Sequence, residues 1–308
     1  MILFASGRTD IPAFYSEWFM NRVKAGFVDV RNPYYPEQVT RYLLNTDAVD
    51  CIVFCSKNPA PIFPYIEELK KFGLYFFVTI TPYGKDIEPN VPDKSKVIED
   101  FAELSRILGK KKIAWRYDPI FINGDYTAAY HIRKFREMAE KLAHFTDRCI
   151  ISFVDLYSKT KKNFPTLKEV SKEDKIFIAQ AFGRIGMELG IRIESCAEDI
   201  DLFAYGVERG ACVSKEVIEK ANGIRLMENG RQHLRKHCDC LPTRDIAYYN
   251  CCPHLCRYCY ANYDEATVRK NYALHDVNSS FLIGGAKSTD VINVAAQKSW
   301  EDKQLLLF

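Results

Sequence analysis

The sequence predicts an α/β protein, and more specifically a TIM-type (β/α)8 barrel that is complete or partial. Short apolar, β-branched and aromatic runs alternate with longer amphipathic segments almost to the end of the 308 residues. Strands that alternate with helices form parallel βαβ units, and eight such strands can close into a barrel. The predicted strands are Ile2–Ser6, Phe27–Val30, Cys51–Cys55, Tyr75–Ile80, Ile113–Tyr117, Cys149–Val154, Ile191–Ser195 and Asp245–Tyr249.

The segments between these strands predict the helices that would cover the sheet. The last of them carries clear end signals, with Ser171 and Asp174 as a capping box and Gly190 as the stop. One strand has an alternative, because Phe27–Val30 could pair with Gln38–Leu43 as a hairpin outside the barrel. The predicted helices are Ala13–Lys24, Pro64–Phe72, Lys94–Leu108, Thr127–Ala143 and Lys172–Leu189.

Composition limits the classes of protein and partner. The chain has 43 basic and 40 acidic residues, so composition alone does not require a polyanionic partner. No basic leader precedes an apolar run, and no run approaches the ~20 apolar residues of a membrane span, so we expect a cytoplasmic protein without a membrane partner. Eleven cysteines in such a protein indicate metal or redox chemistry rather than disulfides. We expect a barrel over residues 1–270, including the loop 251–260, and a carboxy-terminal extension over 271–308.

Three cysteines in the segment Cys252-Pro-His-Leu-Cys256-Arg-Tyr-Cys259 carry the functional prediction. Three thiolates on one short loop can bind three irons of a 4Fe-4S cubane and leave the fourth iron open to an outside molecule. Soft thiolates select iron–sulfur clusters, zinc or Cu(I) over hard cations. A structural zinc site is the alternative, because His254 or Cys251 could supply the fourth ligand that zinc requires.

Four further cysteines lie outside this loop in polar surroundings, namely Cys196, Cys212, Cys238 and Cys240. Such surroundings make inert burial a poor explanation, so we expect a second iron–sulfur cluster or a zinc ion there. Three others lie within apolar strands, where we expect buried thiols: Cys51, Cys55 and Cys149.

Polar residues follow almost every predicted strand, at the end of a barrel where function resides. Each of them alone is typical of a turn or a helix cap, but their agreement at seven strand ends predicts a site. The residues expected to line it and take part in catalysis are Arg8, Asp10, Lys57, Arg116, Asp118 and Glu194.

The cysteine loop resembles the cluster loop of radical S-adenosylmethionine (SAM) enzymes, in which the residue before the third cysteine is usually aromatic, as Tyr258 is. In that family the loop follows the first strand, and a Gly-Gly-Glu segment after the second strand holds the amino group of SAM. Here the loop follows the last strand, so the resemblance implies a circularly permuted barrel. It also implies that Tyr258 flanks the adenine. The segment after the first strand would hold SAM without a Gly-Gly-Glu, through Ser6, Gly7, Thr9 and Asp10.

The wider chain is similar to a bacterial family of unknown function with a carboxy-terminal cysteine cluster. The shared motifs are Arg8–Pro12, Tyr117–Pro119 and Ser152–Asp155, and the similarity covers nearly all of residues 1–265. This resemblance implies no reaction.

Several features hint at nucleic acid as a partner. The tail Gln304–Phe308 resembles the peptide with which bacterial DNA-metabolism proteins bind the sliding clamp, the alternative being that it docks on its own barrel. A looser resemblance to spore photoproduct lyase, a radical SAM enzyme that repairs DNA, implies the same substrate class. Lys159–Lys162 and Arg231–His237 are basic enough to meet phosphates, although solvated surface is the usual meaning of such runs.

Together these observations predict a cytoplasmic radical SAM-like enzyme. It would use one 4Fe-4S cluster, or two, to begin radical chemistry on an unidentified substrate, with a reductant such as a flavodoxin or ferredoxin as partner. Two alternatives stay open: a non-SAM iron–sulfur protein for electron transfer or sensing, and a zinc-stabilised nucleic-acid-binding module.

Overall fold

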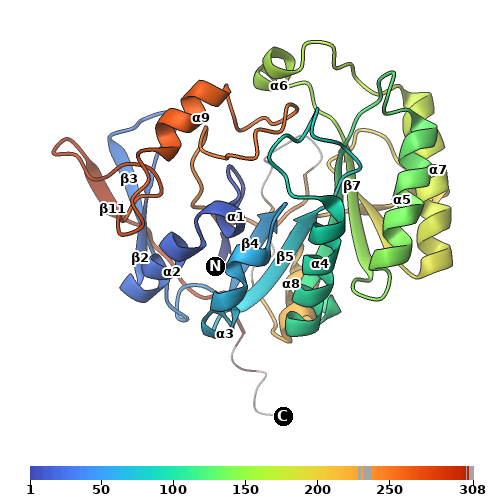
Figure 1. Cartoon of the computed structure of the whole chain (residues 1–308). Helices are drawn as coiled ribbons and strands as arrows, with labels where there is room; N and C mark the ends of the chain where they lie inside the picture. The colour runs from blue at the N-terminus through green and yellow to red at the C-terminus, as the bar shows by residue number, and fades with distance from the viewer. Residues whose placement is uncertain (228–229, 232–237, 303, 305–308) are drawn as a thin grey trace.

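The computed structural model describes residues 1–227, 230–231, 238–302 and 304. Its centre is an eight-stranded sheet with the order β10-β1-β4-β5-β6-β7-β8-β9, in which every neighbouring pair is parallel (Figure 1). The predicted α/β class is therefore confirmed. The strands are β1 (Ile2–Phe4), β4 (Cys51–Ser56), β5 (Gly73–Thr79), β6 (Ile113–Ile120), β7 (Arg148–Phe153), β8 (Arg192–Cys196), β9 (Glu208–Gly210) and β10 (Thr243–Asp245).

The sheet is open, so the predicted barrel is not complete. β9 and β10 stand at its two edges, and no ladder joins them within the described residues. Each edge strand has only three residues and pairs on one side, β9 with β8 and β10 with β1. One backbone hydrogen bond links the chain segments beside them, from the Leu241 N–H to the Val213 carbonyl at 2.8 Å.

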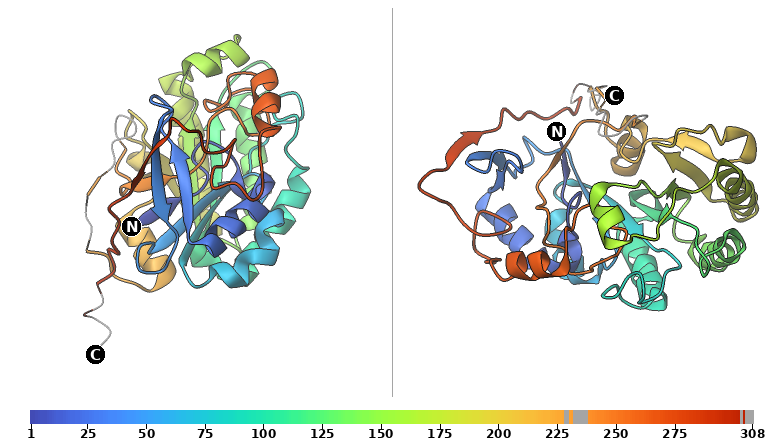
Figure 2. Two further views of the ribbon diagram at one scale, coloured as in Figure 1. Left: turned by 90° about the vertical axis from the view of Figure 1, so that its left-hand side faces the viewer. Right: turned by 90° about the horizontal axis from the view of Figure 1, so that it is seen from above.

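The predicted strand Phe27–Val30 does not belong to the main sheet. It is β2 (Phe27–Arg31), which pairs antiparallel with β3 (Gln38–Leu43), so the hairpin alternative is confirmed. β11 (Val291–Val294) pairs in parallel with β3 and completes a second, three-stranded sheet, visible in Figure 2. The eighth place in the main sheet goes to β9, whose Glu-Arg-Gly sequence contains no apolar run that would predict a strand.

Three long amphipathic helices cover one face of the main sheet (Figure 1), namely α4 (Lys94–Leu108), α5 (Ala128–Leu142) and α7 (Lys172–Leu189). The predicted ends of α7 are confirmed. The Ser171 hydroxyl accepts from the Asp174 N–H at 3.1 Å, and Gly190 ends the helix in the left-handed conformation with φ of +68°.

The other helices are shorter than predicted. The expected helix Ala13–Lys24 is divided at Tyr15, and only Ile66–Leu69 of the expected helix Pro64–Phe72 is α-helical, after a 3₁₀ helix that ends at Tyr65. None of the helices in the described ranges is long and apolar enough to cross a membrane. The short helices are α1 (Ile11–Phe14), α2 (Ser16–Ala25), α3 (Ile66–Leu69), α6 (Ser158–Asn163), α8 (Lys215–Asn222) and α9 (Glu265–Tyr272), with 3₁₀ helices at Ala60–Tyr65, Lys110–Lys112 and Phe203–Tyr205.

Both faces of the main sheet are buried, as is usual for a parallel sheet. In β4, Ile52 and Phe54 belong to the hydrophobic cluster that includes residues of α4, α5 and α7. The alternate residues Cys51 and Val53 belong to a second hydrophobic cluster on the other face. Helix α8 contributes Ile218 to this second cluster. The strands are therefore fixed from both sides, and the loops that follow them are held by a rigid frame.

The carboxy-terminal segment packs along α2 and the hairpin. The Trp18 indole N–H donates to the Ser279 carbonyl at 2.9 Å, and the Arg22 guanidinium donates to the Asn278 carbonyl at 3.0 Å. Farther along, the Trp300 N–H donates to the Asp50 carboxylate at 3.0 Å. The segment after α9 is thus part of the packed structure as far as these contacts reach.

Candidate metal centre

The loops that carry the predicted site residues share one edge of the main sheet, because all of its strands are parallel. The strand arrows in Figure 1 point toward this edge, where α6 and α9 lie. The cysteine loop leaves β10 here and leads into α9. The segment Ser6–Asp10 follows β1, which is the neighbour of β10, and Lys57 follows β4.

Cys252, Cys256 and Cys259 lie on a tight, irregular loop. The Cys259 N–H donates to the Cys256 carbonyl at 3.0 Å, and the Ala261 N–H donates to the Cys259 sulfur at 3.3 Å. Leu255 has φ of +55°, a left-handed conformation that costs an ordinary residue roughly 1–2 kcal/mol. Surrounding contacts must hold the loop in this conformation, and such conformations cluster at functional sites.

Burial and mutual repulsion act on the three thiols. Burial raises the pKa of each of them, and the negative charges of Asp10, Cys259 and Cys256 raise the pKa of Cys252 further. The Lys57 ammonium has the opposite effect on Cys256 and Cys259. A metal cluster, acting as a shared cation, would favour the thiolate forms that burial and mutual repulsion disfavour.

A buried carboxylate that sequence reasoning missed lies beside this loop. Glu88 is 1% exposed and accepts hydrogen bonds from the Lys57 ammonium at 2.8 Å and the Thr81 hydroxyl at 2.7 Å. It also accepts from Lys94 and from the Tyr258 hydroxyl. Burial alone would raise the pKa of Glu88, but the two ammonium charges outweigh it and hold the pKa at about 2. Two lysines facing one carboxylate leave a positive charge in excess beside the cysteines.

Asp10 connects the cysteine loop to two other loops of this edge. Its carboxylate lies 2.9 Å from the His254 Nε2 atom and accepts from the Lys57 backbone N–H at 2.7 Å. It also caps α1 by accepting from the Ala13 N–H at 3.0 Å. Asp10 therefore positions the loop, rather than facing outward.

Several buried polar atoms near the cysteines have no hydrogen-bond partner among the described residues. They are the Ser6 hydroxyl oxygen, the Asn262 side-chain oxygen and the Arg116 Nε atom, whereas the nearby Thr9 hydroxyl contacts the Cys251 thiol. Buried polar groups nearly always have a hydrogen-bond partner, so a buried polar atom without one is a candidate contact for a ligand. Ser6 and Thr9 belong to the segment that the sequence predicts as the SAM contact, and Asn262 follows the third cysteine.

Gly7 and Arg8 pack against the end of β10. A Cβ atom at Gly7 would come within 2.4 Å of the Asp245 carboxylate, so only glycine fits. The Arg8 Nε atom lies 3.3 Å from the same carboxylate, and its guanidinium lies 5.0 Å from the centre of the Tyr249 ring. Burial raises the pKa of Asp245 to about 6, although Arg8 opposes the shift.

The remaining predicted catalytic residues are engaged in ion pairs. The Arg116 guanidinium binds Asp118 and donates to the Cys55 sulfur at 3.5 Å. Glu194 forms a two-point ion pair with Arg148, at 2.9 and 2.6 Å, inside the protein. Arg148 also donates to the Tyr75 hydroxyl at 2.9 Å, so Glu194 lies in a structural network rather than beside the cysteine loop.

All eleven cysteines are among the described residues, and none of them is in a disulfide. The second predicted set is brought together, since the sulfurs of Cys196 and Cys212 lie 2.9 Å apart and Cys240 contacts both. In the positions that the side chains occupy, no three His, Cys, Asp or Glu residues of the described ranges are arranged to hold a metal ion. A metal at either set would need the side chains to adjust.

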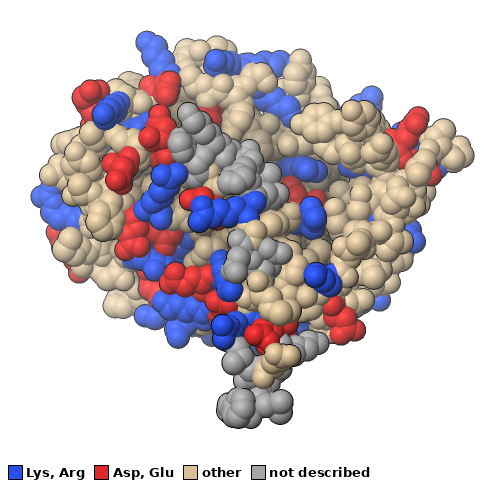
Figure 3. Space-filling view, turned by 180° about the vertical axis from the view of Figure 1, so that it is seen from behind, with Lys and Arg blue, Asp and Glu red and all other residues tan. Residues whose placement is uncertain are grey.

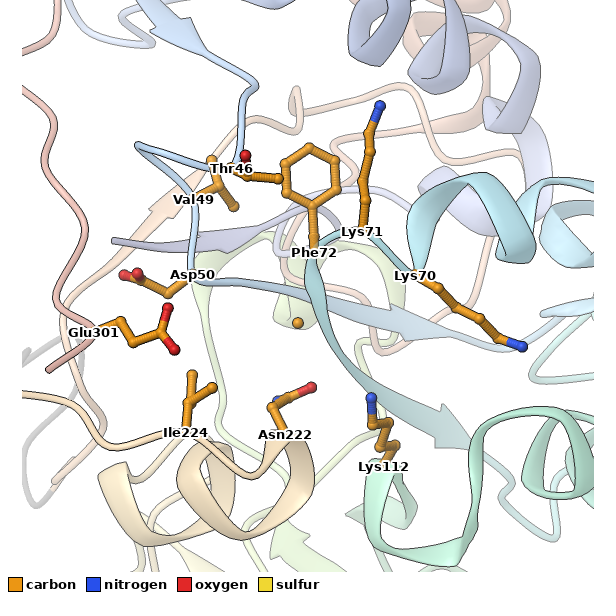
Figure 4. Close-up of a pocket in the computed structure, with 11 residues that line it drawn as sticks. Thr46, Val49, Asp50, Lys70, Lys71, Phe72, Lys112, Asn222, Ile224 and Glu301 are labelled. Atoms are coloured by element: carbon orange, nitrogen blue, oxygen red, sulfur yellow. The ribbon is translucent and has the colours of Figure 1, made fainter. Parts of the chain in front are cut away.

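A hollow of about 270 Å³ lies at the opposite edge, near the amino ends of β4, β5 and β6 (Figure 4). Its lining includes Lys70, Lys112 and Asp50, and the Asp50 carboxylate is occupied by the Ser299 hydroxyl at 2.5 Å. Function in barrels of parallel strands sits at the carboxyl edge instead. The hollow therefore does not compete with the cysteine loop as a candidate site.

The described residues form no uniformly basic surface on the face shown in Figure 3 that would favour a nucleic-acid partner. On the face shown in Figure 3, Lys and Arg side chains are interspersed with Asp and Glu. Lys159 and Lys162 lie over the rings of Tyr249 and Tyr263, at 4.6 and 3.3 Å from their centres. Residues 232–237 of the second basic run, and all of the tail Gln304–Phe308 except its first residue, lie outside the described residues.

Comparison with known proteins adds a family but no activity. No curated protein matches the chain. Among solved structures, it is similar to a protein from Bacteroides thetaiotaomicron VPI-5482 that was provisionally named an alpha-L-fucosidase, with 11% identity over 66% of this chain and 78% of the other, at a TM-score of 0.26. The model of the family DUF1848, described as a domain of unknown function, matches residues 2–261. The chain therefore belongs to the DUF1848 family.

Proposed function

We propose that this protein is a radical SAM-like enzyme whose Cys252, Cys256 and Cys259 bind a 4Fe-4S cluster. When bound, such a cluster takes SAM at its open iron and, after one-electron reduction by a flavodoxin or ferredoxin, starts radical chemistry on a substrate. The protein's own residues would hold the cluster, orient the substrate at the carboxyl edge of the sheet, and exclude water and oxygen.

The observation that carries this proposal is that His254 and Cys251, the candidates for a fourth metal ligand at this loop, both have other partners. The His254 ring lies 2.9 Å from Asp10 through one nitrogen and 3.3 Å from the Asn90 carbonyl through the other. The Cys251 thiol donates to the Tyr248 carbonyl at 3.1 Å. His254 and Cys251 are the two side chains that the sequence offers as a fourth zinc ligand at this loop. With both engaged elsewhere, the three cysteines favour a cluster with one open iron.

The neighbouring strand supports the permuted relation to radical SAM barrels. β1 pairs in parallel with β10, so the segment after β1 lies next to the cysteine loop, as the SAM-binding segment does in that family. Asp10 is already bound to His254. The Ser6 hydroxyl, which has no hydrogen-bond partner among the described residues, is therefore the better candidate to contact SAM.

The test is anaerobic purification of the full chain, followed by iron and sulfide analysis and electron paramagnetic resonance of the reduced protein. We expect about four irons and four sulfides at this loop, as for one cubane. They should be lost in Cys256→Ala and retained in Cys149→Ala, a control that removes a buried thiol of β7. SAM should change the spectrum of the reduced cluster. An unchanged spectrum would support the electron-transfer alternative, and zinc that is lost in Cys256→Ala would support the zinc module.

A further inference from the structure

Four cysteine sulfurs meet at the gap between the two edges of the main sheet. Cys196 is the last residue of β8, Cys212 follows β9, and Cys238 and Cys240 precede β10. The Cys212 sulfur lies 2.9 Å from the Cys196 sulfur, and the Cys240 thiol is in hydrogen-bond contact with the thiols of the other three. We propose that these four cysteines bind a single zinc ion that ties β9 to β10.

The spacing of the sulfurs favours one ion over a second iron–sulfur cluster. Zinc–sulfur bonds of about 2.3 Å in a tetrahedron place the sulfurs about 3.8 Å apart, which is close to direct contact. A cubane holds its cysteine sulfurs much farther apart, because four irons and four sulfides lie between them. Four thiolates in a tetrahedron are a typical structural zinc set.

The present side-chain positions require one adjustment. Because the Cys196 and Cys212 sulfurs are 2.9 Å apart, zinc would have to spread them by about 1 Å. Cys212 is only half-buried, and a rotation about its Cα–Cβ bond can supply that distance without moving the backbone.

Two arginines lie beside this site, and each of them already pairs with a carboxylate, Arg116 with Asp118 and Arg148 with Glu194. Zinc with four thiolates carries a net charge of −2, which is costly to bury without compensation. The Arg116 guanidinium interacts with the charges of Cys196 and Cys212. Arg148 donates to the Ala211 carbonyl at 2.7 Å and to the Cys212 carbonyl at 3.2 Å. The Arg148–Glu194 pair therefore positions the segment that carries Cys212.

The role of the ion follows from its place. A closed barrel would join its first and last strands by a ladder, but here one hydrogen bond from Leu241 to Val213 links the two sides. Both residues belong to the buried cluster that also contains Cys196. A zinc ion at this point would supply the cross-link that strand pairing does not.

The test measures zinc and iron in the full chain, with Cys212→Ala and the matched control Cys149→Ala. We expect about one zinc per chain in the wild type and the control, and zinc binding weaker by at least ~100-fold in Cys212→Ala, measured by competition with a chromophoric chelator. Iron at the cysteine loop should be unaffected by Cys212→Ala and lost in Cys256→Ala. The two metal proposals can therefore fail independently.

Wild-type protein provides a second readout if Cys212→Ala does not fold. Removal of zinc by a chelator should expose all four cysteines to iodoacetamide, as mapped by peptide mass spectrometry. It should also speed amide hydrogen exchange in residues 208–214 and 238–245, while β4, β5 and β6 stay protected. A zinc-free protein, iron at these four cysteines, or a Cys196–Cys212 disulfide in a non-reducing peptide map would each overturn the proposal.

Discussion

The Asp10 carboxylate lies 2.9 Å from the His254 imidazole, although 244 residues separate them in the chain. The same carboxylate accepts from the Lys57 backbone N–H at 2.7 Å. One side chain thus ties the cysteine loop to the ends of β1 and β4. Because three neighbouring loops meet at Asp10, the geometry of the cysteine loop depends on a residue that belongs to the opposite end of the sequence.

Asp10→Asn is expected to loosen the cysteine loop. The amide has one oxygen in place of two and carries no charge, so it cannot keep all three contacts of the carboxylate, and we expect a loss of about 1–3 kcal/mol of unfolding free energy. Denaturant titration measures this loss, and iron bound at the loop should pass faster to a competing chelator. Asp47→Asn, at an exposed turn, is the control. Equal rates of iron loss in both variants would contradict the positioning role.

Lys94→Met is expected to lower the reduction potential of the cluster. Lys57 and Lys94 face the single carboxylate of Glu88, so removing one ammonium group abolishes the excess positive charge beside Cys256. A reduced cluster, which gains a negative charge, then becomes harder to form. Redox titration followed by electron paramagnetic resonance measures the shift. Lys96→Met, exposed on the same helix, should leave the potential where it was.

Gly7→Ala is expected to destabilise the junction of β1 and β10. The added methyl group would meet the Asp245 carboxylate at 2.4 Å, and overpacking of this kind costs roughly 1–3 kcal/mol. Gly124→Ala is the matched control, since a methyl group there meets no atom within 4 Å. Thermal and denaturant unfolding of the two variants gives the comparison, and equal stability would show that the Asp245 contact yields without cost.

His131 makes the protein less stable in mild acid. Its ring lies 2.9 Å from the Tyr117 hydroxyl and 2.8 Å from the Phe121 carbonyl, and burial lowers its pKa to about 4. The unfolded chain takes up the proton near pH 6.5, so the stability that His131 contributes at pH 7 is lost as the pH falls from about 6.5 toward 4. Between pH 7 and pH 5 we expect a loss of about 2 kcal/mol.

The His131→Gln variant isolates this effect. The unfolding free energy of the wild type should fall more steeply between pH 7 and pH 5 than that of the variant. Because Asp245 has a raised pKa and shifts stability in the opposite sense over this range, only the difference between the two proteins is diagnostic. Parallel curves would show that His131 takes up its proton over the same pH range in the folded and the unfolded chain.

Most of the main sheet could be predicted because its long strands carry their own signal. Apolar runs such as Cys51–Ser56 are buried on both faces, which local sequence reveals. β9 could not be predicted, since its three residues, Glu-Arg-Gly, become a strand only by pairing with β8. The open edge was missed for the same reason, because closure depends on pairing between distant segments.

The candidate site shows a similar division. Counting strand ends placed Asp10 and Lys57 near the cysteine loop, since Asp10 follows β1, the neighbour of β10, and Lys57 follows β4, the next strand along. The same reasoning grouped Glu194 with them, but its partner Arg148 stands on the adjacent strand, and such cross-strand pairs leave no mark in the sequence. Glu88 was missed because it is the ninth residue after β5 ends, in a loop, and no motif or spacing in the sequence indicates that such a residue turns back to the site.

The first strand of the sheet pairs with the last, with Ile2 opposite Thr243. During synthesis on the ribosome, β1 must wait for more than two hundred residues before this partner emerges, and such long-range pairing is slow. Until then its edge is open to stray partners. Any metal bound at the cysteine loop, as proposed above, would therefore arrive late in synthesis, and a chain that stalls before β10 has neither a complete sheet nor the three cysteines of that loop.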